Sequence, residues 1–206
     1  MKDKDFKGIA NLIYEAGILA KTPRSGFHFL GTGDQTVAEH TNRVVIIGYI
    51  LASMEDGVDV LKVMKMCMLH DLAEGRTSDL NYVHQKYVTV AEDQAVHDLA
   101  SKVPFGKDIE TTLDEYEERA SDEAKLAKDA DQLEWLISLK EQYDLGNTRA
   151  RTWFDSAVKR LKTGIAQKLA EVILDTESDD WWFNNKNDDW WVNRNGGKKK
   201  TKPSDK

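Results

Sequence analysis

The chain has 206 residues, a hydrophobic share of 40%, a charged share of 32% and a formal net charge of −7. This length suits one buried core, and no apolar run approaches the ~18 residues of a membrane span. The last eleven residues hold five lysines and one aspartate, so the rest of the chain carries −11, a charge that disfavours nucleic-acid binding. We expect neither a nucleic-acid nor a membrane partner.

Cys67 is the single cysteine. Because it cannot form an internal disulfide, the simplest compartment is a reducing one, and we expect a cytoplasmic protein.

Apolar residues recur at helical spacing along most of the chain, and only three prolines interrupt it. The pattern predicts an all-α fold with one domain over residues 1–176. We expect helices near 4–20, 35–54, 58–74, 88–102, 107–118, 121–144 and 148–176. The stretches 21–34 and 75–87 lack a period and predict loops.

The composition changes at residues 177–206. "DDWWFNN" at 179–185 is echoed by "DDWWVNR" at 188–194, and a lysine-rich end follows. Two copies are too few for a repeat architecture. We expect a flexible tail rich in Trp, Asn and Lys. The alternative is a tail whose tryptophans dock on the body, on a twin subunit or on another protein.

Three predicted helices each carry a polar residue within an apolar stripe. These residues are His40, His70 and Asp129. The apolar residues on their faces are Val37, Val44, Ile47 and Leu51; Val63, Met66 and Ala73; and Leu126, Leu133 and Leu136. Taken singly, such a histidine is more often a hydrogen-bonded core residue than a ligand.

Together these residues favour a metal site. An ionised carboxylate buried without a partner costs several kcal/mol, and a divalent cation would remove that cost. His40, His70, Asp71 and Asp129 are therefore predicted to bind one divalent transition metal ion, which could be Mn, Co, Fe or Zn. Because adjacent residues differ by about 100° around a helix, the ion should lie near the helix end, which we expect at Gly75.

The segments "VAEHTNRV", "MLHDLAEGRTSDL" and "LAKDADQLEWL" resemble the HD-domain metal-dependent phosphohydrolases. The chain looks closest to their small 5'-deoxynucleotidase branch, which acts on deoxynucleoside monophosphates, and the resemblance covers about residues 5–145. It implies a helical HD-domain bundle, a homodimer and a nucleotide substrate. The family's metal ligands match the four residues above.

The same resemblance places the family's catalytic acids at Glu74 and Asp79 and its phosphate-binding arginine at Arg24, with Phe27 as a candidate neighbouring aromatic. This chemistry suits the residue types. Phosphate monoesters need positive charge and a positioned water. Either acid could orient the water or transfer a proton, and the sequence does not separate their roles.

Two alternatives remain open at this stage. One is an HD phosphohydrolase that acts on a cyclic nucleotide, a guanosine alarmone or a nucleoside triphosphate. The other is a non-catalytic helical scaffold whose metal is structural, which a saturated ligand shell would favour. Glu74 and Asp79 argue against the scaffold.

Overall fold

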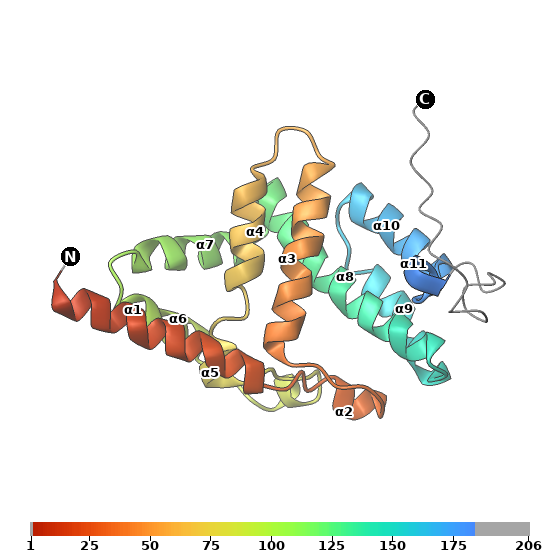
Figure 1. Ribbon diagram of the computed structural model, residues 1–206, viewed down its shortest axis with the longest axis horizontal. Helices are drawn as coiled ribbons and strands as arrows, with labels where there is room; N and C mark the ends of the chain where they lie inside the picture. Colours follow the sequence, from red (N-terminus) through yellow and green to blue (C-terminus); the bar gives the residue numbers. More distant parts are fainter. Residues whose placement is uncertain (1, 184–206) are drawn as a thin grey trace, which may run out of the picture.

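The computed structural model describes residues 2–183, and this part of the chain is all-α, as predicted (Figure 1). Residues 184–206, which include most of the predicted tail, lie outside the described residues. Within residues 2–183 no helix is both long and apolar enough to span a membrane.

The helices alternate with short connections. In chain order they are α1 (Asp3–Ala16), η1 (Gly17–Lys21), α2 (Phe27–Leu30), α3 (Val37–Ser53), α4 (Val60–Leu69), α5 (Glu74–Thr77), η2 (His84–Lys86), α6 (Glu92–Ala100), α7 (Gly106–Glu118), α8 (Asp122–Asp144), η3 (Thr148–Ala150), α9 (Arg151–Val158), α10 (Gly164–Asp175) and α11 (Asp180–Phe183).

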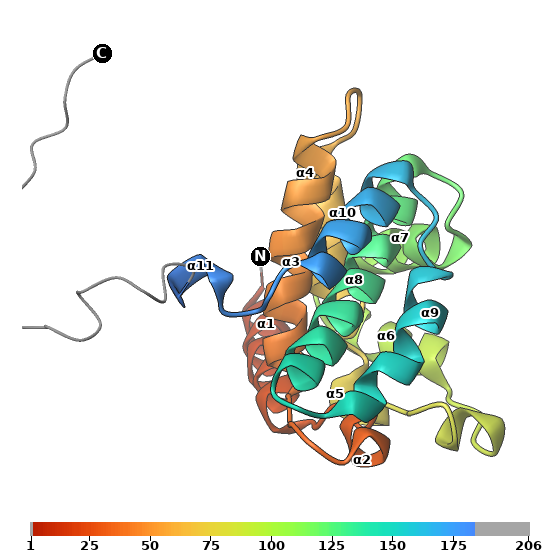
Figure 2. The same cartoon turned by 90° about the vertical axis from the view of Figure 1, so that its right-hand side faces the viewer.

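Helices α3, α4 and α8 form the centre of the molecule. Figure 1 shows α3 beside α4, with α8 crossing them; in this view α1, α6 and α7 lie to the left and α9 and α10 to the right. Figure 2 shows α9 and α10 beside α8. Every apolar residue of the three predicted stripes is buried. At Gly48 a Cβ atom would lie 2.5 Å from the Cys67 Sγ atom, so glycine lets α3 approach α4 closely.

Helix α3 begins at a capping box that fixes the backbone one turn before His40. The Thr36 hydroxyl accepts a hydrogen bond from the Glu39 amide at 3.2 Å, and the Glu39 carboxylate accepts one from the Thr36 amide at 2.7 Å. Such a cap contributes about 1 kcal/mol.

The chain departs from the predicted helix over 58–74, because α4 ends at Leu69. The following residues form tight turns, in which the Leu72 amide bonds to the Leu69 carbonyl and the Glu74 amide to the Asp71 carbonyl. Gly75 therefore lies inside α5 and does not end the helix. The earlier end places His70 and Asp71 at a helix terminus, where both can face one point.

The predicted helix over 148–176 is also wrong, because the chain divides it into η3, α9 and α10. Thr163 starts α10 by accepting a hydrogen bond from the Ala166 amide. The backbone amides of Lys162 and Thr163 point to the Asp129 carboxylate on α8. This contact with a distant helix competes with helical hydrogen bonding and breaks the segment.

Candidate active site

Two buried imidazoles face each other between α3 and α4. The Nε2 atoms of His40 and His70 are 3.4 Å apart. Their Nδ1 atoms contact the Glu134 carboxylate at 2.5 Å and the Cys67 carbonyl at 2.8 Å. Because both partners only accept hydrogen bonds, each Nδ1 donates, and in a neutral ring each Nε2 keeps its lone pair.

Two carboxylates complete the cluster. The Asp71 Oδ2 atom is 3.4 Å from His40 Nε2 and 3.1 Å from His70 Nε2, and the Asp131 Oδ1 atom is 3.3 Å from His40 Nε2. Burial raises the pKa of both carboxyl groups, but the neighbouring imidazoles more than offset it and hold both pKa values below the usual range. The ligand atoms of His40, His70 and Asp131 lie within 4.8 Å of one another.

This donor set fits a divalent cation. Two nitrogen lone pairs and two carboxylate oxygens point at one small space, and acceptors so close repel one another unless positive charge lies between them. Burial and the nearby Arg24 lower the pKa of His40, but hydrogen bonds to Asp131 and Glu134 raise it to about 9. The cluster therefore stabilises a positive charge, which a metal ion supplies more fully than a proton.

Asp129, the predicted fourth ligand, faces elsewhere. It is 1% exposed, and its carboxylate accepts hydrogen bonds from the Lys162 amide at 2.9 Å, the Thr163 amide at 2.7 Å and the Thr163 hydroxyl at 2.7 Å. Residues two apart on a helix differ by about 200°, so Asp129 and Asp131 lie on opposite faces of α8. The carboxylate that α8 brings to the histidines is that of Asp131.

Glu134 supports the cluster from behind His40. It is fully buried, and besides His40 it accepts hydrogen bonds from Arg43 Nη2 at 2.7 Å and Gln35 Nε2 at 2.6 Å. Burial raises the pKa of Glu134, but His40 and Arg43 lower it to about 2. Glu134 therefore stays ionised and fixes the orientation and the tautomer of His40.

Arg24 reaches the same site from the loop between η1 and α2. Its backbone amide bonds to the Gln35 carbonyl, which ties this loop to the start of α3. Arg24 Nη1 contacts the Asp71 carboxylate at 3.3 Å and the Asp79 carboxylate at 3.0 Å. Asp79 also accepts bonds from the Ser25 amide at 2.6 Å and the Ser25 hydroxyl at 3.0 Å.

Glu74 differs from Asp79, because its Oε2 atom is buried and has no hydrogen-bond partner. Burial, followed by the charges of Asp71 and Asp79, raises the pKa of Glu74 to about 9. A cation bound at the cluster would lower that pKa. Glu74 is thus a carboxyl group available for proton transfer.

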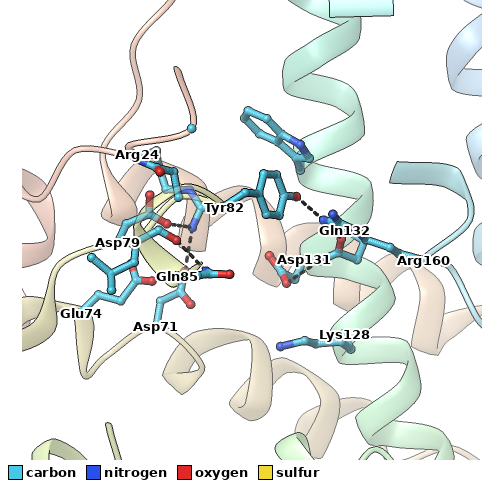
Figure 3. Close-up of a pocket in the computed structure, with 14 residues that line it drawn as sticks. Arg24, Asp71, Glu74, Asp79, Tyr82, Gln85, Lys128, Asp131, Gln132 and Arg160 are labelled. Carbon is cyan, nitrogen blue, oxygen red and sulfur yellow. Dashed lines mark hydrogen bonds and ion pairs between the residues drawn. The ribbon is translucent and has the colours of Figure 1, made fainter. Parts of the chain in front are cut away.

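A cavity of about 290 Å³, shown in Figure 3, is bordered by Arg24, Asp71, Glu74, Asp79 and Asp131 among others. Arg24, Asp71, Glu74 and Asp79 lie on one side of it. Lys128, Asp131 and Gln132 face them from α8, with Arg160 beside them and Tyr82 crossing between the sides. The predicted aromatic neighbour of Arg24 is not among the lining residues: Phe27 is 7% exposed and packs edge-on against Trp135, which does line the cavity.

A sequence profile described as "HD domain" matches residues 16–173. The chain belongs to the HD domain family. The curated 5'-deoxynucleotidase HDDC2 of Mus musculus is 24% identical over 179 residues, covering 82% of this chain and 88% of the mouse protein.

Solved structures of other proteins share the fold. A conserved hypothetical protein from Pyrococcus furiosus has a TM-score of 0.65 at 28% identity and covers 81% of this chain and 97% of its own. A cyanophage S-2L HD phosphohydrolase, DatZ, solved with dA and one catalytic Zn²⁺ ion, has a TM-score of 0.51 at 22% identity, covering 79% of this chain and 93% of its own. At that identity the second likeness concerns the fold alone.

Asp131 and Glu134 were not among the predicted site residues, although the sequence contains a signal for them. Ala127, Asp131, Glu134 and Ser138 follow one another at i, i+4, i+7 and i+11, a single face of the HD-domain helix α8. Asp131, Glu134 and Ser138 are polar residues that recur at helical spacing beside the buried apolar residues Leu126, Leu133 and Leu136, and such a pattern indicates a polar site between helices.

The two aspartates of α8 should respond oppositely to amidation. Asp129→Asn removes the charge that three donors share, and we expect the free energy of unfolding to fall by about 1.5–3 kcal/mol with metal affinity retained. Asp131→Asn should weaken Mn²⁺ or Zn²⁺ binding more than about a hundredfold, beyond what outer-shell changes cost, with little loss of stability. Denaturant unfolding and titration calorimetry measure both. If Asp129→Asn lost metal affinity and Asp131→Asn kept it, Asp129 would be the ligand instead.

Glu134→Gln should weaken metal binding by about 10–100-fold, because His40 loses the ionised acceptor that orients it. Glu141→Gln is the matched control, since Glu141 also pairs with Arg43, at 2.6 Å, but does not touch His40. Competition with a chelating dye measures the affinity. Equal affinities of the two variants would contradict the role of Glu134.

Proposed function

We propose that this protein is a metal-dependent phosphohydrolase that removes the 5'-phosphate from deoxynucleoside monophosphates. One observation carries the proposal: the cluster of His40, His70, Asp71 and Asp131 contributes both of its aspartates to the lining of a cavity that also contains Arg24. The names of the curated relatives, such as the mouse 5'-deoxynucleotidase, support this substrate class.

His40, His70, Asp71 and Asp131 would hold the ion. Nitrogen and oxygen donors accept Mn, Co, Fe or Zn, so all four remain candidates. When bound, such an ion lowers the pKa of water and withdraws charge from a phosphate oxygen. Asp129 is not part of this proposal, because its oxygens accept hydrogen bonds from Lys162 and Thr163.

Arg24 and Lys128 would bind the phosphate. Arg24 offers a planar fork of donors that suits two phosphate oxygens. Lys128 faces it across the cavity and adds a second positive charge (Figure 3). Both offset the four carboxylates that line this cavity and would otherwise repel an anionic substrate.

Glu74 and Asp79, both predicted catalytic acids, have separate roles in this proposal. Glu74 exchanges the proton, because its buried Oε2 atom is free of hydrogen bonds. Asp79 holds Arg24 in place, because its carboxylate already accepts bonds from Arg24 and Ser25. Asp79 is thus a positioning residue.

Metal-loaded protein should release inorganic phosphate from deoxynucleoside 5'-monophosphates but not from the 3'-monophosphates. We expect His40→Ala and Asp71→Ala to lower the rate by more than about a hundredfold, a larger loss than outer-shell changes cause. His97→Ala is the matched control, because that imidazole is 64% exposed and pairs with Glu110 outside the cluster. Chelation should abolish turnover, and full activity of His40→Ala would refute the proposal.

We further propose that the protein is a homodimer. The α3 face opposite the site exposes Ile46, Tyr49 and Ile50 at i, i+3 and i+4, each 41–53% accessible. A contiguous exposed apolar face typically marks a protein interface. Tyr49→Asp should convert a dimer to a monomer in light scattering. A wild-type protein that is monomeric at about 50 μM, a concentration far above a nanomolar Kd, would contradict this proposal.

A further inference from the structure

A second cavity adjoins the first beyond Tyr82. It has a volume of about 250 Å³ and is lined by Tyr82, Trp135, Trp153, Ser156, Ala157 and Arg160. Three of these residues, Tyr82, Trp135 and Arg160, also line the cavity that contains Arg24. The two spaces therefore share a wall. We name the second space the aromatic cavity.

Tyr82 and Arg160 form part of that shared wall. Arg160 donates a hydrogen bond to the Tyr82 hydroxyl, and its guanidinium carbon lies 4.7 Å from the centre of the Tyr82 ring. Figure 3 shows Tyr82 crossing from the Asp79 side of the cavity to Gln132 and Arg160. Tyr82 is 46% exposed, so the pair is held by surface interactions that cost little to open.

Aromatic rings dominate the remaining walls. The rings of Trp135 and Trp153 lie 6.0 Å apart at an interplanar angle of 48°. The Ser156 hydroxyl donates to the Trp153 carbonyl at 2.8 Å, so it is not free to donate to a ligand. Flat faces and a guanidinium plane suit a planar, aromatic ligand.

The position of the aromatic cavity matches the shape of a nucleotide. Trp135 lies one helical turn beyond Asp131 on α8, about 6 Å along the axis. A ligand whose phosphate is held near Asp131 and Arg24 would place its other end at Trp135. In a nucleoside monophosphate that end is the base, which is separated from the phosphate by the sugar.

We propose that the aromatic cavity is the nucleobase subsite, in which the base stacks on Tyr82 and Trp153. This inference rests on the proposed function for the position of the phosphate. Stacking of one base on an aromatic side chain is worth about 1–3 kcal/mol. Purines, which have the larger face, should depend on the two rings more than pyrimidines do.

The test compares a substrate with a base and one without. We expect Tyr82→Leu and Trp153→Leu, which keep apolar bulk but remove the ring, to raise the KM for deoxyadenosine 5'-monophosphate about tenfold. The value of kcat/KM for 2-deoxyribose 5-phosphate should stay within about twofold of wild type, because this substrate has no base that could bind the aromatic cavity in either protein. Trp181→Leu is the matched control, since Trp181 lies on α11 and is 85% exposed.

A binding measurement separates this inference from the proposed function. Calorimetric binding of deoxyadenosine to the metal-loaded protein should weaken about tenfold in both variants, and thermal unfolding should show that they are folded. If the wild-type protein bound deoxyadenosine but hydrolysed neither deoxyadenosine 5'-monophosphate nor 2-deoxyribose 5-phosphate, the proposed function would be refuted and the nucleobase subsite would stand. An unchanged KM for the nucleotide, an equal loss on both substrates, or undiminished deoxyadenosine binding would overturn the subsite.

Discussion

The need for positive charge between the Nε2 atoms of His40 and His70 governs the candidate site. The two atoms lie 3.4 Å apart with carboxylate oxygens of Asp71 and Asp131 at similar distances. Hydrogen-bond acceptors packed this closely in a buried space are stable only around a cation or shared protons. The burial that makes the cluster costly without a cation also strengthens its hold on one, because the local dielectric is low.

Rigid helices hold this cluster in place. His40 is fixed by Glu134 at 2.5 Å, and Glu134 is fixed by Arg43 from the next turn of α3. Each contact joins α3 to α8, so the packing of these two helices also sets the orientation of the His40 imidazole. A site built on packed helices keeps its geometry better than one built on loops.

The segment after α5 links the two ends of the cavity. Asp79 holds Arg24 and Ser25, while Tyr82, three residues later, reaches Arg160. The two predicted acids, Glu74 and Asp79, differ in their hydrogen bonding. The Asp79 carboxylate accepts three hydrogen bonds, from Arg24 and Ser25, whereas the Oε2 atom of Glu74 has no partner. Two carboxylic acids close in sequence thus have different hydrogen-bond partners, because the groups around them come from different segments.

The sequence by itself determined the apolar faces of the helices and the chemistry favoured by the polar residues set among them. Helical spacing placed His40, His70 and Asp129 among core residues, and all three are buried. Helical spacing could not show which groups each buried side chain would contact. Asp129 meets the amides of Lys162 and Thr163, whereas Asp131 meets the histidines. Periodicity indicates the side of a helix that faces inward, but the partners of a buried side chain come from segments distant in sequence. Only the packing of those segments therefore decided that Asp129 binds the connection between α9 and α10 while Asp131 joins the cluster.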